Sequence, residues 1–145
     1  MNEFDFVVIG GGSAGYAAAR TASAEGLRTA VIDGAAELGG LCILRGCMPS
    51  KTLIESANRL QEMREAAEFG LWAEHISFDG AKIIERKKRL VAEFAKYRSE
   101  QLEHGKFELI RGHARFTGPH ELDVRLHSGA TQTVRARATV ITTGS

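Results

Sequence analysis

A strand, a glycine-rich turn and a helix at the start of the chain constrain the fold more than any other feature. Residues 4–9 (FDFVVI) form a short apolar, β-branched run, which predicts a buried parallel strand. An alanine-rich helix is expected over residues 14–25, closed by Gly26 in a left-handed conformation, with a second strand over residues 29–32. The turn between strand and helix reads G-x-G-x-x-G, and its glycines are Gly10, Gly12 and Gly15.

This strand–turn–helix unit predicts a dinucleotide site. Gly10 makes the tight turn, Gly12 lets a pyrophosphate approach the backbone, and Gly15 lets helix and strand pack closely. An ordinary glycine turn is the alternative. The dinucleotide interpretation is favoured because strand, turn, helix and second strand all occur in order.

The residues around this turn suggest how the ligand binds. Free N–H groups at the start of the helix, at Ser13 and Ala14, would face the phosphates. Asp33 ends the second strand about 20 residues after the turn, the position of an acid that accepts hydrogen bonds from a ribose. Because an acid there disfavours a 2′-phosphate, FAD or NAD is expected rather than NADP.

Both cysteines of the chain, Cys42 and Cys47, lie in one short glycine-rich stretch. They are either two small inert residues or a redox pair, and a zinc site is disfavoured because no second cysteine pair or nearby histidine accompanies them. A disulfide needs Cα atoms about 4.4–6.8 Å apart, whereas five residues of regular helix rise about 7.5 Å. An oxidised pair therefore requires an irregular segment, which Gly46 and Pro49 permit.

The stretch 39–51, GGLCILRGCMPSK, resembles the redox-active segment of the class I pyridine nucleotide-disulfide oxidoreductases, GGTCxNxGCxPSK. That family includes dihydrolipoamide dehydrogenase, glutathione reductase and mercuric reductase. The resemblance implies FAD as the dinucleotide, with Cys42 attacking the substrate disulfide, Cys47 lying beside the flavin and Lys51 near the flavin ring. The matching residues are Gly39, Gly40, Cys42, Gly46, Cys47, Pro49, Ser50 and Lys51.

The chain departs from the family pattern without losing a redox atom. Leu41 stands in place of a threonine whose hydroxyl contacts the FAD phosphates, so a polar contact is missing there. Leu44 replaces the usual asparagine, Arg45 adds a charge, and Asp33 stands where glutamate is commoner.

Two long helices are expected after the cysteine stretch. The first carries one apolar face through residues 53–67, and residues 68–77 interrupt the pattern. Asp79 is a predicted N-cap for the second, which ends before Gly105. Trp72 is assigned to the core or an interface. The basic run 86–89 is assigned to a solvated helix face in preference to an anion site.

Short strands are expected over residues 107–116, 122–126, 131–136 and 138–144. RGHARF (111–116) resembles the family segment that touches adenine, which makes Ala114 the contact. ATVITTG (138–144) resembles the second FAD signature, with Thr143 and Gly144 at the cofactor. His113 is assigned as a strand residue, and His120 and His127 as solvated. The fold class expected is α/β: a Rossmann-type parallel sheet with a helical pair and a small antiparallel β-meander.

The resemblance covers the chain from end to end, although proteins of the family are several times longer. It implies that residues 1–145 are the N-terminal part of a discontinuous FAD-binding domain, without the NAD(P) and dimerisation domains. Residues 1–145 alone are therefore expected to be inactive. The parent would be a homodimer that moves electrons between NAD(P)H and a small dithiol or disulfide, like dihydrolipoamide dehydrogenase. Mercuric or glutathione reductase-like activity and a non-catalytic FAD-binding module are the alternatives.

The composition and charge of the chain indicate which classes of partner, metal site and cellular location to expect. The net charge of +1 gives no reason to expect nucleic acid or an anionic membrane as a partner. No apolar run approaches the roughly 18 residues of a membrane span, and the first residues lack the basic region of a signal peptide. The scattered histidines predict no metal site. Together with a single close cysteine pair, these features predict a cytoplasmic protein.

Overall fold

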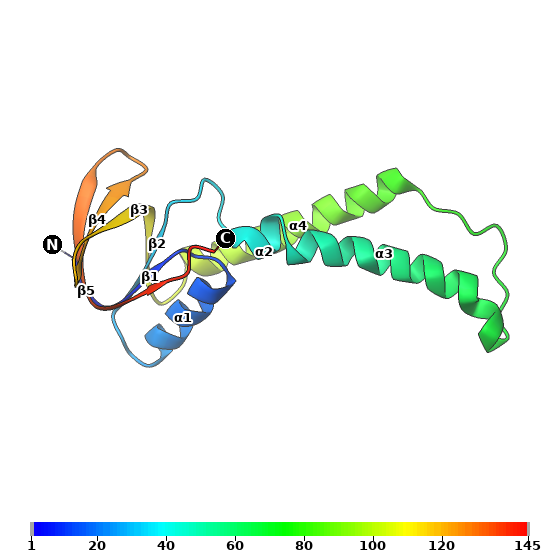
Figure 1. Ribbon diagram of the computed structural model, residues 1–145, viewed down its shortest axis with the longest axis horizontal. Helices are drawn as coiled ribbons and strands as arrows, with labels where there is room; N and C mark the ends of the chain where they lie inside the picture. Colours follow the sequence, from blue (N-terminus) through cyan, green and yellow to red (C-terminus); the bar gives the residue numbers. More distant parts are fainter. Residues whose placement is uncertain (1, 145) are drawn as a thin grey trace.

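The computed structural model describes residues 2–144. Five strands and four α-helices follow one another along the described residues in the order shown in Figure 1, with the last three strands consecutive. The elements are β1 (Asn2–Ile9), α1 (Ser13–Ala24), β2 (Thr29–Asp33), α2 (Gly40–Leu44), α3 (Cys47–Glu65), the short 3-10 helix η1 (Ala66–Phe69), α4 (Gly80–Glu103), β3 (Glu108–Gly118), β4 (Glu121–Leu126) and β5 (Thr131–Ile141).

The strands form one mixed sheet that closes on itself. β1 lies between β2 and β5 and runs parallel to both, with Val8 opposite Val31 on one side and Val140 on the other. β3 continues the parallel part beside β2 and then pairs antiparallel with β4, which pairs antiparallel with β5. The expected α/β class, with a parallel sheet and an antiparallel meander, is confirmed.

The C-terminal part of the sheet differs from the sequence-based prediction in one respect. Two strands were predicted over residues 131–136 and 138–144, but a single strand, β5, runs from Thr131 to Ile141. Residues 131–135 pair with β4 and residues 134–141 pair with β1, so β5 changes partner without a turn. The change of partner alters which face is buried, and that disturbs the alternation from which strands are predicted.

Alternating side chains of β1 serve two separate cores. Val7 points into the closed sheet and packs with Ile32, Leu122 and Val134. Val8 points outward, where it packs with residues of α1 and with Leu102 at the end of α4. Because α1 covers the sheet with alanines, it can lie close to the strands that carry the glycine turn.

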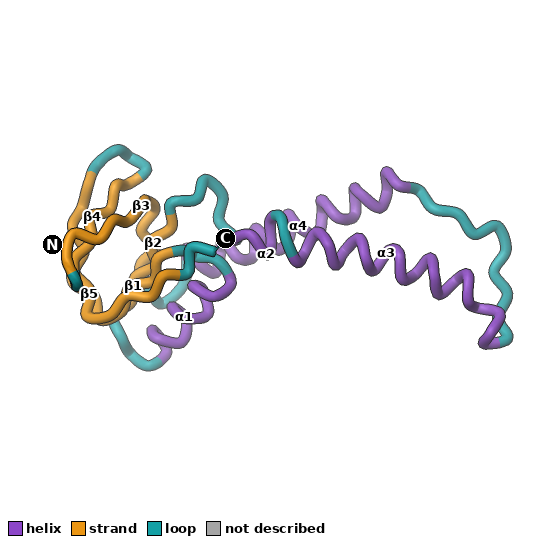
Figure 2. The backbone as a smooth tube through the Cα atoms, in the orientation of Figure 1, coloured by secondary structure: helices purple, strands orange, loops and turns teal. Residues whose placement is uncertain are grey.

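Helices α3 and α4 form an arm that extends away from the sheet (Figure 1). Asp79 caps α4 by accepting a hydrogen bond from the Lys82 N–H at 3.1 Å, as predicted. Gly26 follows α1 at φ +81°, as predicted. Trp72 is 86% exposed, so it lies outside the core of this chain, and its assignment to an interface stays a prediction. The loop at the far end of the arm is visible in Figure 2.

No helix within residues 2–144 has the length and apolar character needed to cross a lipid bilayer.

Candidate functional site

The glycine turn is packed so tightly that two of its glycines have no room for a side chain. Gly10 adopts φ +102°, and a Cβ there would lie 2.5 Å from the Thr142 carbonyl oxygen. A Cβ on Gly15 would collide with the Gly10 carbonyl oxygen. Gly12 is different, because its nearest neighbour would be the Gly40 Cα at 3.8 Å. The turn therefore has no free space beside Gly10 and Gly15, whereas the backbone at Gly12 has space for an approaching group.

Gly40 brings the cysteine stretch against this turn. It adopts φ +72°, and a Cβ there would lie 2.7 Å from the Gly12 Cα. Any larger residue at position 40 would push the two backbones apart. This contact seats the first turn of α2, and with it Cys42, beside the start of α1.

Asp33 is held by the backbone of the turn that it faces. Its Oδ2 accepts a hydrogen bond from the Gly11 N–H at 2.7 Å, and its Oδ1 accepts one from the Ala35 N–H at 2.8 Å. The side chain is buried, with 8% of its surface exposed. Each carboxylate oxygen keeps a further lone pair, so the predicted contact with a ribose hydroxyl stays possible alongside the backbone bonds.

The cysteine segment is an interrupted helix, as an oxidisable pair requires. α2 ends at Leu44, Arg45 and Gly46 leave helical geometry, and α3 begins at Cys47. Both cysteines are free thiols, with Cys42 half-buried and Cys47 exposed. The break removes the full helical rise that would otherwise separate them.

The two thiols titrate as a pair. The pKa of Cys42 is lowered chiefly because the Cys47 thiol donates a hydrogen bond to it, with smaller contributions from the Cys47 N–H, the Ser13 hydroxyl and the charge of Lys51. The pKa of Cys47 is raised, because it gives that hydrogen bond and lies beside the Cys42 thiolate. One proton therefore leaves readily and the second is retained.

The glycine turn and both cysteines line one cleft of about 720 Å³. Most of the predicted site residues meet there: Gly10, Gly12, Ser13, Ala14, Asp33, Gly40, Leu41, Cys42, Cys47, Ala114, Thr143 and Gly144.

Two predicted site residues, Gly15 and Lys51, do not line the cleft. Gly15 faces the Gly10 carbonyl and the Thr142 hydroxyl, so it acts through packing. Lys51 is exposed one turn into α3, where its charge lowers the pKa of Cys42 from a distance.

The sequence analysis missed several residues of the cleft. Thr142 donates its hydroxyl to the Gly10 carbonyl at 2.8 Å and so ties the end of β5 to the turn. His113 lies against Gly34, whose missing side chain makes room for the ring. His127 does not line the cleft; it is exposed, as predicted, and its Nε2 lies 3.2 Å from the Gly34 carbonyl oxygen. The one sequence signal for His113 was its position next to Ala114, the predicted contact of the adenine.

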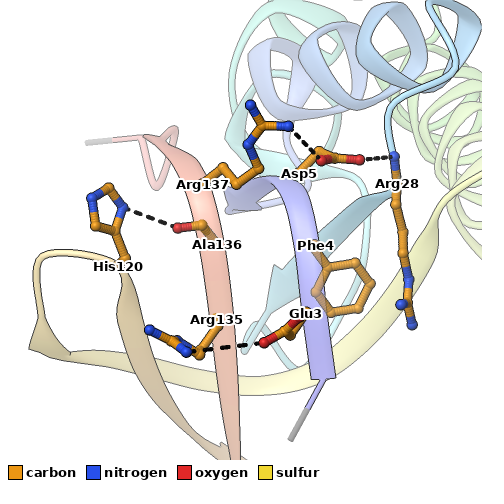
Figure 3. A pocket seen from close by; sticks show the side chains of 8 residues that line it. All are labelled: Glu3, Phe4, Asp5, Arg28, His120, Arg135, Ala136 and Arg137. Carbon is orange, nitrogen blue, oxygen red and sulfur yellow. Dashed lines mark hydrogen bonds and ion pairs between the residues drawn. The ribbon is translucent and has the colours of Figure 1, made fainter.

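A second groove, of about 630 Å³, lies at the other end of β1 (Figure 3). Its charged side chains are engaged with one another. Arg137 pairs with Asp5 at 3.2 Å and Arg135 with Glu3 at 4.0 Å. No cysteine, serine or threonine of residues 2–144 lines this groove, so the cleft at the glycine turn, which holds both thiols, is the better candidate site.

Comparison with known proteins decides the family. The profile described as pyridine nucleotide-disulphide oxidoreductase matches residues 4–145. This chain belongs to that family. The proteins of the pyridine nucleotide-disulphide oxidoreductase family are flavoproteins that use FAD and NAD(P).

Several relatives in the family are named as dehydrogenases or reductases. Dihydrolipoyl dehydrogenase of Bacillus subtilis is 38% identical over 81% of this chain and 24% of its own length. The enzyme of the same name from Zymomonas mobilis is 34% identical over 99% of this chain and 31% of its own length. Leghemoglobin reductase of Vigna unguiculata is 34% identical over 99% of this chain and 28% of its own length.

A solved structure supports the same assignment. The flavoprotein disulfide reductase RclA of Escherichia coli superposes with a TM-score of 0.77 at 28% identity, over 99% of this chain and 29% of RclA. The chain thus spans between about a quarter and a third of the length of these relatives.

The geometry of the cleft fits the FAD of this family. The turn is open at Gly12, where a phosphate would need close approach to the backbone. The first turn of α1 leaves N–H groups without partners inside the helix, and its dipole favours an anion there.

Proposed function

We propose that this protein is the FAD-binding part of a disulfide oxidoreductase that resembles dihydrolipoamide dehydrogenase, with the Cys42–Cys47 pair as its redox centre. One observation carries the proposal: a single cleft is lined by the dinucleotide turn at Gly12 and by both cysteines. A bound flavin and a dithiol pair would then be neighbours within one domain.

Bound FAD would supply a two-electron acceptor and donor beside the cysteines. The chain's own residues would bind and orient it. The backbone of Gly12, Ser13 and Ala14 would hold the phosphates, and Asp33 and Ala114 would hold the adenosine end. Gly40, Leu41, Thr143 and Gly144 would shape the remaining wall, and Lys51 would bias the charge near Cys42 and the flavin.

The cysteine pair would exchange electrons with a small dithiol by thiol–disulfide exchange. A substrate thiolate attacks one sulfur of the oxidised pair and displaces the other cysteine as a thiolate, which leaves a mixed disulfide between substrate and protein. The second substrate thiol then attacks the substrate sulfur of this mixed disulfide and displaces the first cysteine. The substrate leaves as a disulfide and Cys42 and Cys47 become two thiols, so two electrons have moved to the protein. The shared proton of the reduced pair supports this role, because the lowered pKa of Cys42 favours its thiolate, which is the reactive form of a cysteine.

The remaining machinery of the reaction is proposed to lie outside residues 1–145. These residues would be the N-terminal part of a discontinuous FAD domain, and the NAD(P) site, the acid–base histidine and the dimerisation domain would be elsewhere in a longer, cytoplasmic homodimer. The exposed apolar side chains along the arm, among them Phe69, Trp72 and Phe78, support an interface with another subunit.

The half-reaction with a dithiol tests the proposal on the full-length parent protein, because residues 1–145 alone are expected to be inactive. The oxidised parent is saturated with FAD and given dihydrolipoamide without oxygen. We expect loss of the oxidised flavin absorbance at a rate well above that of free FAD with the same dithiol. Cys42→Ser and Cys47→Ser are expected to abolish the effect while leaving FAD binding in place.

Other outcomes distinguish the alternatives. A response to reduced glutathione but not to dihydrolipoamide would move the assignment to a glutathione reductase-like branch. Tight FAD binding with no reduction by any dithiol would contradict the redox proposal and leave a binding module.

A further inference from the structure

Arg45 has a position in the cleft that the cysteine chemistry does not explain. It lies in the break between the two helices, three residues after Cys42, and it lines the same cleft as the glycine turn. Its N–H donates to the Leu41 carbonyl at 2.9 Å and so closes the last turn of α2, although the backbone of Arg45 itself has left helical geometry. Leu41 and Arg45 both line the cleft, so the two residues border the same space.

The side chains that line the cleft carry more negative than positive charge, which is unfavourable for an anionic ligand. Arg45 is the one arginine or lysine among the described residues that line it, against the acids Asp33 and Glu37. A dinucleotide carries a diphosphate, which adds negative charge to a cleft that already contains two carboxylates. The helix dipole of α1 offsets part of that charge, and a guanidinium is suited to the rest.

Arg45 is also free to take such a ligand. Within residues 2–144 it enters no ion pair. Several other arginines near the sheet are engaged: Arg135 and Arg137 pair with carboxylates, Arg28 and Arg98 lie over aromatic rings, and Arg111 donates to the Ala35 carbonyl.

Leu41, which lines the cleft in the same segment as Arg45, also bears on how a phosphate could bind. It is 49% exposed and presents an apolar surface to the cleft beside the turn, so its side chain offers a phosphate no hydrogen bond. Gly40 holds this first turn of α2 against Gly12. A phosphate bound at Gly12 therefore has the apolar Leu41 beside it, and Arg45, unpaired within the described part of the chain, lies four residues further along the same wall of the cleft.

We propose that Arg45 binds the diphosphate of the FAD, and so supplies the polar contact on α2 that Leu41 does not. The inference rests on the proposed function, because it needs FAD in this cleft. It adds a residue whose role is to hold the cofactor, distinct from the two thiols that react.

The test is a calorimetric titration of the chain with FAD at several salt concentrations. Arg45→Gln should weaken FAD binding roughly tenfold at low salt, because a charge-assisted hydrogen bond is lost. The salt dependence of the affinity should become shallower, because one screened attraction has been removed. Arg45→Lys should fall between the two. Arg64→Gln, the same charge change on an exposed position of α3, is the matched control and should bind like the unaltered chain.

Three results would overturn the inference. FAD binding by Arg45→Gln with unchanged affinity would remove Arg45 from the site and leave the proposed function standing. An equal loss at every salt concentration would show a structural effect, not a contact with phosphate. Failure of the unaltered chain to bind FAD at all would contradict both the inference and the proposed cofactor site.

Discussion

The two cysteines show how a pair of exposed residues acquires unequal chemistry. Burial raises the pKa of both thiols, so it does not explain why their pKa values shift in opposite directions. The asymmetry comes from one hydrogen bond, which the Cys47 thiol gives and Cys42 receives, and which stabilises a thiolate on Cys42. The hydrogen bond from Cys47 thus makes Cys42 the more nucleophilic thiol of the pair.

Removing that donor should move the pKa of Cys42 upward. In reduced Cys47→Ala, the rate of Cys42 alkylation by iodoacetamide is expected to fall at neutral pH, and its pH midpoint to shift to higher pH. Cys47→Ser keeps a hydroxyl that can donate and should shift the midpoint less. The modified residue is identified by peptide mass spectrometry. An identical pH profile in the Ala variant and the unaltered protein would refute the hydrogen-bond explanation.

Gly15 is a residue whose whole role is the absence of a side chain. A Cβ there would overlap the Gly10 carbonyl and press on Thr142, so α1 would have to move off the sheet. Gly15→Ala should lower the free energy of unfolding in urea by about 2–3 kcal/mol. The control is Gly80→Ala in the first turn of α4, where a Cβ meets nothing within 4 Å. It should be neutral or stabilising by up to about 1 kcal/mol. Equal effects of the two substitutions on the free energy of unfolding would contradict the close packing of Gly15 against the Gly10 carbonyl.

At the scale of elements, the boundaries were predictable where one residue sets them. Gly26 ends α1 and Asp79 begins α4, and both act through local backbone geometry that the sequence displays directly. The interruption of the helix at Arg45 and Gly46 was predictable, because a disulfide holds two Cα atoms closer together than five residues of regular helix do. The course of β5 was not predictable, because its two halves have different partners that are distant in the sequence. Asp33 is similar: its position was evident, but its bond to the Gly11 N–H depends on how the turn folds back.

The cap of α4 offers a test confined to one element. Asp79→Ala removes the acceptor of the Lys82 N–H and should destabilise the start of α4 by about 1 kcal/mol. Faster hydrogen exchange of the amides in the first turn of α4, with little change in β1, would be the signature. Asp79→Asn retains an acceptor and should behave like the unaltered chain. Uniformly faster exchange throughout the molecule would contradict a local role.

At the scale of the molecule, a closed sheet carries the site and an arm extends from it (Figure 1). The core lies inside the sheet and under α1, whereas the far end of the arm exposes large apolar side chains. The hydrophobic pattern of the arm could not reveal this, because an apolar helix face looks the same in sequence whether it meets this chain's own core or another surface.

Two substitutions at apolar positions should therefore differ sharply. Leu102 is fully buried beneath the glycine turn, and Leu102→Ala should cost about 3 kcal/mol of unfolding free energy. Trp72→Ser should change it by less than about 0.5 kcal/mol, because the indole is exposed. Both values come from urea denaturation. A large loss for Trp72→Ser would show that the arm folds back onto the domain.

The central claim is that the cleft couples a flavin to the Cys42–Cys47 pair. Its most direct test is a stepwise anaerobic reduction of the oxidised, FAD-saturated protein with dithionite, with thiols counted after denaturation at each step. We predict no free thiols at the start, two thiols after the first two electrons, and a long-wavelength charge-transfer band at that point. Two freely titrating thiols in the oxidised protein, with reduction of the flavin alone and no such band, would contradict the claim.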